Sequence, residues 1–186
     1  MTNGDGAASA ARPDRVSRSA RAFWLTSGLW LAADQLTKGL VVRAGPPGTV
    51  LATVIPDYLE LTHSRNPGAA FSLLAGHQGA RWLFSAVAVL AVVLIIGCRR
   101  AIWALPAVER FGLALVAAGA AGNLADRLCR GGLVVDFIRC HLYFGHWSYL
   151  WPDFNIADSG VVCGMLLYVG HTLYAEWAAP PAATEA

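Results

Sequence analysis

Two aspartates stand in apolar surroundings and could together perform acid–base chemistry. Asp136 lies within Leu133–Ile138, where every other residue is apolar, whereas an acid in a soluble loop normally has polar neighbours. Asp158 enters an apolar run that contains no basic partner for it. Two carboxylates brought together tend to share one proton, so the ionised one can activate water while the protonated one polarises a carbonyl. The pair predicts peptide-bond hydrolysis with neither a metal nor a covalent nucleophile.

Several other polar residues fall inside apolar segments, where an ionisable side chain is costly and is a functional candidate. Asp34 and Lys38 have i,i+4 spacing on one helix face, which favours a self-neutralising structural pair. Asn123, Asp126 and Arg127 share another face, which predicts a polar cluster around Asp126. Arg127 is also placed to meet an anionic group or a peptide carbonyl.

Asn155 and Asp158 share a face through i,i+3 spacing. A contact with the N-terminal end of the helix is the structural alternative for Asp158. The motif Gly160-x-x-x-Gly164 predicts close helix packing.

Other chemistries find little support in the sequence. The five histidines form no HExxH motif, the serines have no GxSxG context, and the four cysteines form neither a CxxC motif nor a zinc pattern. We therefore expect no metal and no cofactor. Cys129 and Cys140 could approach each other, but a disulfide between them is not expected.

The composition indicates an integral membrane protein that forms one compact bundle. Of the 186 residues, 56% are hydrophobic and 14% are charged, whereas soluble domains carry about a quarter charged residues. The mean hydropathy is +0.48. The net charge of +2 is too small to neutralise many phosphates, so we expect no nucleic-acid partner.

Four segments are long and apolar enough to be predicted membrane spans, namely residues 22–42, 82–98, 111–128 and 156–177. Residues 1–21 are predicted to be a disordered basic tail, and residues 178–186 a second short tail. Four arginines precede the first span, and three more lie between the second and third. By the positive-inside rule both termini are cytoplasmic, and residues 43–81 and 129–154 lie outside.

The first outer segment contains a β-branched run at 49–55 and an alternating run at 58–62, with turn residues before and between them. A small sheet on the outer membrane surface is the expected structure. The predicted fold class is therefore an all-α membrane bundle of four transmembrane helices with a small extracytoplasmic β-sheet.

The sequence resembles bacterial lipoprotein signal peptidase (signal peptidase II), an aspartic membrane peptidase that cleaves lipid-modified prolipoproteins. Five blocks in the family's order carry the resemblance: DQLTK at 34–38, NPGAAF at 66–71, GNLADR at 122–127, VVDF at 134–137 and FNIADS at 154–159. One block alone would be weak evidence, but five in order are very specific. The stretch 137–157 is somewhat longer and more aromatic than is expected for the family. This difference would change the lid or the membrane contact and leave the chemistry intact.

The resemblance implies a role for each matching residue. Asp136 and Asp158 would be the catalytic pair. The expected contacts to the substrate backbone, or to a peptide inhibitor such as globomycin, are Asn66, Asn123, Arg127 and Asn155. The expected supports of the site are Asp34, Lys38 and Asp126. The family fold adds a β-cradle to the four helices.

The expected enzyme is an aspartic endopeptidase of the bacterial plasma (inner) membrane. It would remove signal peptides from diacylglyceryl-modified prolipoproteins, cutting before the lipidated cysteine near the outer face, with membrane lipids around it. One alternative is a non-catalytic or specialised paralogue that binds prolipoprotein or inhibitor. Another is a proton-coupled transporter, which predicts acids spread through the bilayer depth, whereas the four acids of the blocks cluster at the outer side.

Overall fold

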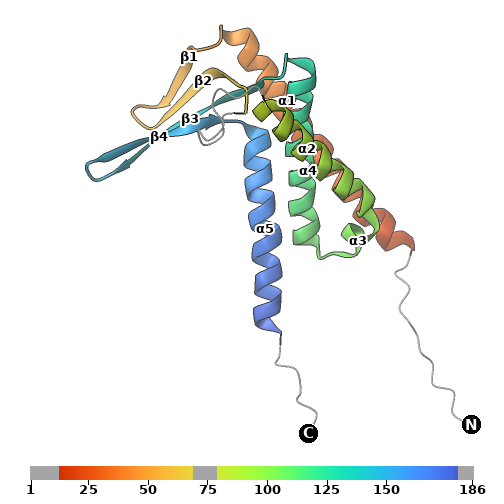
Figure 1. Cartoon of the computed structure of the whole chain (residues 1–186). Coiled ribbons are helices and arrows are strands. Elements are labelled where there is room, and N and C mark those ends of the chain that lie inside the picture. The colour runs from red at the N-terminus through yellow and green to blue at the C-terminus, as the bar shows by residue number, and fades with distance from the viewer. Residues whose placement is uncertain (1–12, 69–78, 180–186) are drawn as a thin grey trace, which may run out of the picture.

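The computed structural model describes residues 13–68 and 79–179, which form a helical bundle with a sheet across one end (Figure 1). The elements are α1 (Pro13–Ala44), β1 (Val50–Ile55), β2 (Leu59–Asn66), α2 (Gly79–Gly97), α3 (Arg99–Ala104), α4 (Ala107–Cys129), β3 (Val134–Phe144), β4 (Trp147–Phe154) and α5 (Ile156–Ala178). The sheet lies where α1 ends and α5 begins, and α3 lies at the opposite end of the bundle (Figure 1).

The four predicted spans correspond to α1, α2, α4 and α5, with one correction at the N-terminus. Helix α1 begins at Pro13, so residues 13–21 are helical, and the prediction that they are disordered is wrong. Proline suits the first position of a helix, and no helix breaker follows it before Gly28. Ser19 and Phe23 are buried, so packing also stabilises this first part of α1.

Charged side chains lie inside the bundle, and many large apolar side chains lie on its surface. Asp34 and Lys38 of α1 are fully buried, whereas Leu36 between them is 68% exposed. Within residues 13–68 and 79–179, α5 is the one helix long and apolar enough to cross a membrane, and residues 82–97 of α2 form a shorter apolar helix. The buried charges of α1 and α4 lower the hydropathy of those two helices.

The sheet is antiparallel with strand order β1-β2-β3-β4. Strands β1 and β2 arise from the two runs that predicted a small sheet. Strands β3 and β4 together form a long hairpin from the aromatic stretch, whose structure the sequence analysis left open. The register places Ser64 of β2 opposite Asp136 of β3, which brings the end of β2 beside that aspartate.

Helices α4 and α5 approach closely through glycines, which confirms the predicted packing role of Gly160 and Gly164. A Cβ at Gly164 would collide with the carbonyl oxygen of Gly112 in α4, and a Cβ at Gly160 would collide with the Trp30 indole. The Trp30 Nε1–H also donates a 3.0 Å hydrogen bond to the carbonyl oxygen of Ile156 at the start of α5. This packing holds α5 against both α1 and α4.

Gly164→Ala should therefore lower the midpoint of thermal unfolding in detergent, because overpacking a tight contact costs about 1–3 kcal/mol. Gly170→Ala is the matched control in the same helix, since no atom lies within 4 Å of a Cβ placed there. We expect the control to leave the midpoint unchanged or to raise it. Equal midpoints for the two variants would contradict the packing role of Gly164.

Candidate active site

Asp136 is held in β3 by two side-chain amides. Its carboxylate is 2% exposed. Oδ1 accepts a 2.6 Å hydrogen bond from Asn155 Nδ2, and Oδ2 accepts a 2.8 Å hydrogen bond from Asn66 Nδ2. The oxygen of Asn66 accepts from the backbone N–H of Gly68, so the local turn fixes this amide. Both donors match residues that the sequence assigned to the site.

Asp158 lies in the first turn of α5 and caps the helix. The backbone N–H of Asp158 donates to Asn155 Oδ1 at 3.0 Å, and Asp158 Oδ2 accepts from the backbone N–H of Asn155 at 3.1 Å. This capping box is the helix contact that the sequence analysis gave as the structural alternative. The other oxygen, Oδ1, accepts from Asn123 Nδ2 at 2.8 Å. One carboxylate oxygen therefore caps the helix, and the other accepts a hydrogen bond from Asn123.

Asn155 links the two aspartates. It contacts Asp136 through its side-chain N–H and Asp158 through its backbone N–H. Burial and, next, the negative charge of Asp158 raise the pKa of Asp136 to about 7, against the lowering effect of the Asn66 and Asn155 donors. The structure thus brings together the two acids that the sequence predicted as a pair.

Lys38 lies at the centre of the buried polar cluster. Its Nζ lies 2.9 Å from Asp34 Oδ2 and 3.3 Å from Asp126 Oδ2, and all three side chains are fully buried. The same Nζ donates a 2.9 Å hydrogen bond to Asn123 Oδ1. Because an ammonium can only donate, it orients the Asn123 amide with its oxygen toward Lys38 and its NH₂ toward Asp158.

Asp34 and Asp126 hold the backbone next to the candidate catalytic acids. Asp34 Oδ1 accepts from the N–H of Ala157 at 2.9 Å. Asp126 Oδ2 accepts from the N–H of Val135 at 3.0 Å. Ala157 directly precedes Asp158, and Val135 directly precedes Asp136. The two supporting acids therefore position the chain at the two candidate catalytic positions.

Gln35 is a member of this cluster that the sequence analysis did not single out. Its Nε2 contacts Asp34 Oδ2 at 3.0 Å, Asp126 Oδ1 at 3.2 Å and the carbonyl oxygen of Gly122 at 3.1 Å. The signal in the sequence was an amide side chain directly after Asp34 within an apolar segment. A second overlooked residue, the acid Glu109, is buried at the other end of α4 and pairs with His171, away from this site.

Arg127 does not pair with its neighbour Asp126, although their adjacent positions in the sequence suggest such a pair. Asp126 pairs with Lys38 and, at 3.4 Å, with Arg130. Arg127 instead lies over the Phe84 ring, with 5.9 Å from Cζ to the ring centroid, and donates to the Asn123 carbonyl oxygen at 3.3 Å. Its Nε is buried and has no hydrogen-bond partner among the residues that the structure describes. This N–H is free to meet a carbonyl or an anionic group.

Residues 69–71 of the NPGAAF block lie outside the described part of the chain, whereas Asn66 and Gly68 lie within it. In the described ranges, no three His, Cys, Asp or Glu side chains gather where they could hold a metal ion. The four cysteines are free, so Cys129 and Cys140 do not form a disulfide.

Comparisons with known proteins find similar sequences and a similar fold. A family model for Signal peptidase (SPase) II matches residues 26–174. The lipoprotein signal peptidase of Desulforapulum autotrophicum is 40% identical over 155 residues, covering 81% of this chain and 90% of the relative. That of Rhodococcus jostii is 40% identical over 181 residues, covering 92% and 82%. A solved bacterial membrane enzyme superposes with a TM-score of 0.71 at 26% identity, covering 88% of this chain and 94% of its own.

Lys38→Met should destabilise the protein strongly, because it leaves the buried carboxylate of Asp34 without its cation and that of Asp126 with the more distant Arg130, a loss of about 3–5 kcal/mol. Arg130→Met is the matched control, since Arg130 contacts the same Asp126 but is 22% exposed. We expect the control to cost less than about 1 kcal/mol. Thermal unfolding in detergent would measure both, and a Lys38→Met protein as stable as the control would contradict the central role of Lys38.

Proposed function

The chain belongs to the signal peptidase II family of aspartic peptidases, which cleave signal peptides from prolipoproteins, and we propose that Asp136 and Asp158 carry out this reaction. The observation that supports the assignment is the shared Asn155, which contacts both carboxylates inside a buried polar cluster. These two linked acids are also the acids of the VVDF and FNIADS blocks. The protein is thus a peptidase, and the two aspartates are its proposed catalytic pair.

The pair works with one proton between its two carboxylates. The ionised aspartate takes a proton from water, and the resulting oxygen attacks the scissile carbonyl carbon. The protonated aspartate donates to the carbonyl oxygen as negative charge develops there. Collapse of the tetrahedral intermediate breaks the C–N bond, and a proton passes to the leaving nitrogen. The pair then holds one proton again, so the cycle consumes only water.

The asparagines and Arg127 prepare the site for the substrate. Asn66, Asn123 and Asn155 donate to the aspartates, which holds the carboxylate oxygens in place. Arg127 can offer its unpartnered Nε–H to a carbonyl of the substrate backbone. Contacts of the three asparagines with the substrate remain a prediction. A globomycin-like peptide inhibitor would occupy the same place.

The reaction takes place at the outer face of the bacterial inner membrane. We assign α1, α2, α4 and α5 as four spans, with both termini in the cytoplasm and the sheet outside. The assignment is supported by the exposed apolar side chains of the helices and by Arg99 and Arg100, which lie in α3 at the end opposite the sheet (Figure 1).

This arrangement suits a substrate whose cysteine carries diacylglycerol. The lipid would hold the scissile bond, directly before that cysteine, at a fixed depth beside the aspartates. Anchoring of this kind makes the attack effectively intramolecular. A proton-coupled transporter would need a relay of acids through the bilayer, whereas Asp34, Asp126, Asp136 and Asp158 gather in one cluster near the sheet.

Asp136→Asn and Asp158→Asn should each reduce cleavage of a diacylglyceryl-modified prolipoprotein by about 10²–10⁴-fold or more, because each removes a proton donor or acceptor from the reaction. The change from carboxylate to amide preserves the side-chain shape, so membrane insertion should be unaffected. Asp153→Asn is the control, an acid of β4 that pairs with Arg139. Near-normal turnover by either variant of the pair would exclude the mechanism.

The cleavage rate should fall as the pH rises through about 7, because ionisation of Asp136 removes the proton that the pair shares. Asn66→Ala deletes a hydrogen bond that stabilises the ionised carboxylate, so the pKa of Asp136 rises and the fall in kcat moves to higher pH. Thr62→Ala is a control in the same strand, since Thr62 donates to Asp153. A fall in kcat that stays in place, or moves to lower pH, in Asn66→Ala would contradict this assignment.

A further inference from the structure

The outer part of the β3–β4 hairpin extends beyond the rest of the sheet. Strand β2 pairs with β3 as far as Cys140, and the His141 N–H donates a 2.8 Å hydrogen bond to the carbonyl oxygen of Tyr58. From Leu142 to Leu150 the strand partners lie within the hairpin itself. Figure 1 shows this ribbon projecting sideways from the bundle, with its free end far from α5 and its base at the beginning of that helix. An isolated two-stranded ribbon is marginally stable in water, so a surface that supports the hairpin is expected.

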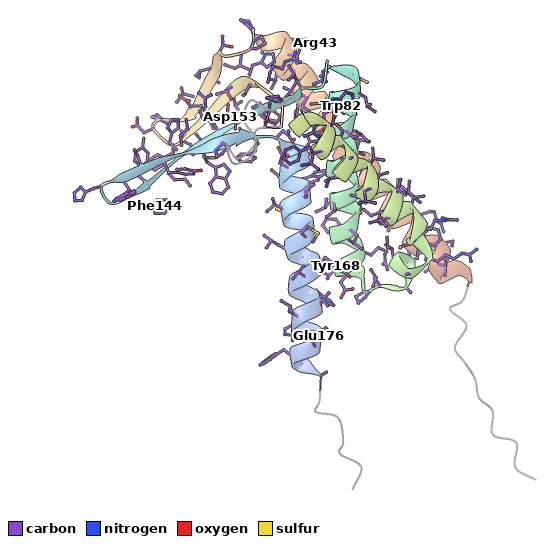
Figure 2. All side chains as sticks on the ribbon, in the orientation of Figure 1. Arg43, Trp82, Phe144, Asp153, Tyr168 and Glu176 are labelled. Atoms are coloured by element: carbon purple, nitrogen blue, oxygen red, sulfur yellow. The ribbon has the colours of Figure 1, made fainter. Side chains whose placement is uncertain are left out.

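One face of the ribbon is entirely apolar. Residues directly opposite each other in a sheet share a face, and three such pairs occur here: Phe144 with Trp147, Leu142 with Tyr149, and Cys140 with Trp151. Trp147 is 81% exposed, Phe144 67%, Tyr149 51% and Trp151 45%. We call these four side chains the aromatic face. Figure 2 shows Phe144 near the free end of the hairpin.

The opposite face is mixed, because the polar His141 and Ser148 share it with Leu150, which lies opposite His141 and is 52% exposed. Ser148 lies there, opposite Tyr143, whose ring packs edge-on against Tyr58 at 5.3 Å between centroids. His141 Nε2 lies 3.4 Å from Glu60 Oε2 on the same face. Residues 140–151 contain no Asp, Glu, Lys or Arg. The ribbon therefore has one apolar face, one mixed face and an uncharged tip.

We propose that the aromatic face lies in the lipid interface of the outer leaflet. Tryptophan and tyrosine favour the membrane–water boundary, and a large exposed apolar patch marks an interaction surface. Strand β4 ends at Phe154 and α5 begins at Ile156, so the hairpin adjoins a helix on which the apolar Val162 and Leu166 are exposed. The proposal rests on the four-span arrangement proposed above.

The hairpin would also set the depth of the catalytic pair. Strand β3 contains Asp136 near its start and Phe144 at its end, so the aromatic face and one catalytic aspartate belong to one continuous strand. Aromatic residues held in the interface fix the height of that strand above the lipid tails. A lipid-anchored scissile bond has a fixed height as well, and the hairpin would align the two.

The test uses the full chain with its four native cysteines replaced by alanine and a single new cysteine labelled with the environment-sensitive fluorophore NBD. Trp147→Cys places the probe on the aromatic face, and Ser148→Cys is the matched control on the opposite face. Both proteins are reconstituted in phosphatidylcholine–phosphatidylglycerol vesicles. Lipids with a nitroxide near the headgroup, or iodide in the water, then quench the fluorescence.

We expect the probe at position 147 to lose most of its fluorescence to the lipid nitroxide and to be protected from iodide, with the reverse at position 148. Equal behaviour of the two probes would overturn the proposal. Protection of position 147 from both quenchers, lost on dilution of the protein in lipid, would assign the face to a second copy and would also overturn it.

A probe at Leu166→Cys, exposed along α5, separates this proposal from the one on which it rests. Quenching at 166 by a nitroxide deep in the lipid tails, without quenching at 147, would reject the hairpin proposal alone. Absence of quenching at 166 would reject the membrane arrangement itself. Cleavage of a diacylglyceryl-modified prolipoprotein by the cysteine-free parent tests the peptidase activity independently of both.

Discussion

The buried ammonium of Lys38 is the interaction on which the rest of this structure depends. Lys38 is the only lysine of the sequence, and it neutralises charge on both Asp34 and Asp126 where water is excluded. Buried carboxylates are tolerated only when they are paired and hydrogen-bonded. Once paired, each accepts a hydrogen bond from the backbone N–H just before a proposed catalytic aspartate. A single cation therefore joins α1 and α4 to the two segments that contain the proposed catalytic pair.

The orientation of the site amides follows from the same cation. Lys38 accepts no hydrogen bond, so Asn123 turns its oxygen to Lys38 and its NH₂ to Asp158. Asn155 turns its oxygen to the N–H of Asp158 and its NH₂ to Asp136. Each aspartate thus receives a side-chain donor, yet burial still leaves the pKa of Asp136 near neutrality. That balance suits a carboxyl group that must both hold and release a proton.

The fold could be predicted from the sequence wherever the signal is local. Four apolar segments, turn residues and β-branched runs indicated four long helices and a small sheet, and the relevant periodicities occur within single elements. The start of α1 was misplaced because arginine and serine near its beginning resemble a polar tail, although Ser19 and Phe23 pack against the bundle. The hairpin of β3 and β4 was left open because its strands are defined by pairing with each other.

For the site, the sequence by itself determined which residues are the candidates for the chemistry. Two acids without local partners, an i,i+4 acid–base pair and five ordered blocks identified the nine residues assigned to it. Only the tertiary structure decided their partners: Asp126 with Lys38 and Arg130 rather than Arg127, and Asn66 with Asp136 across the strand register. The physical reason is distance along the chain. Side-chain type and spacing within one element are local properties, whereas a hydrogen bond between residues 70 positions apart exists only after packing has set the helices and the register.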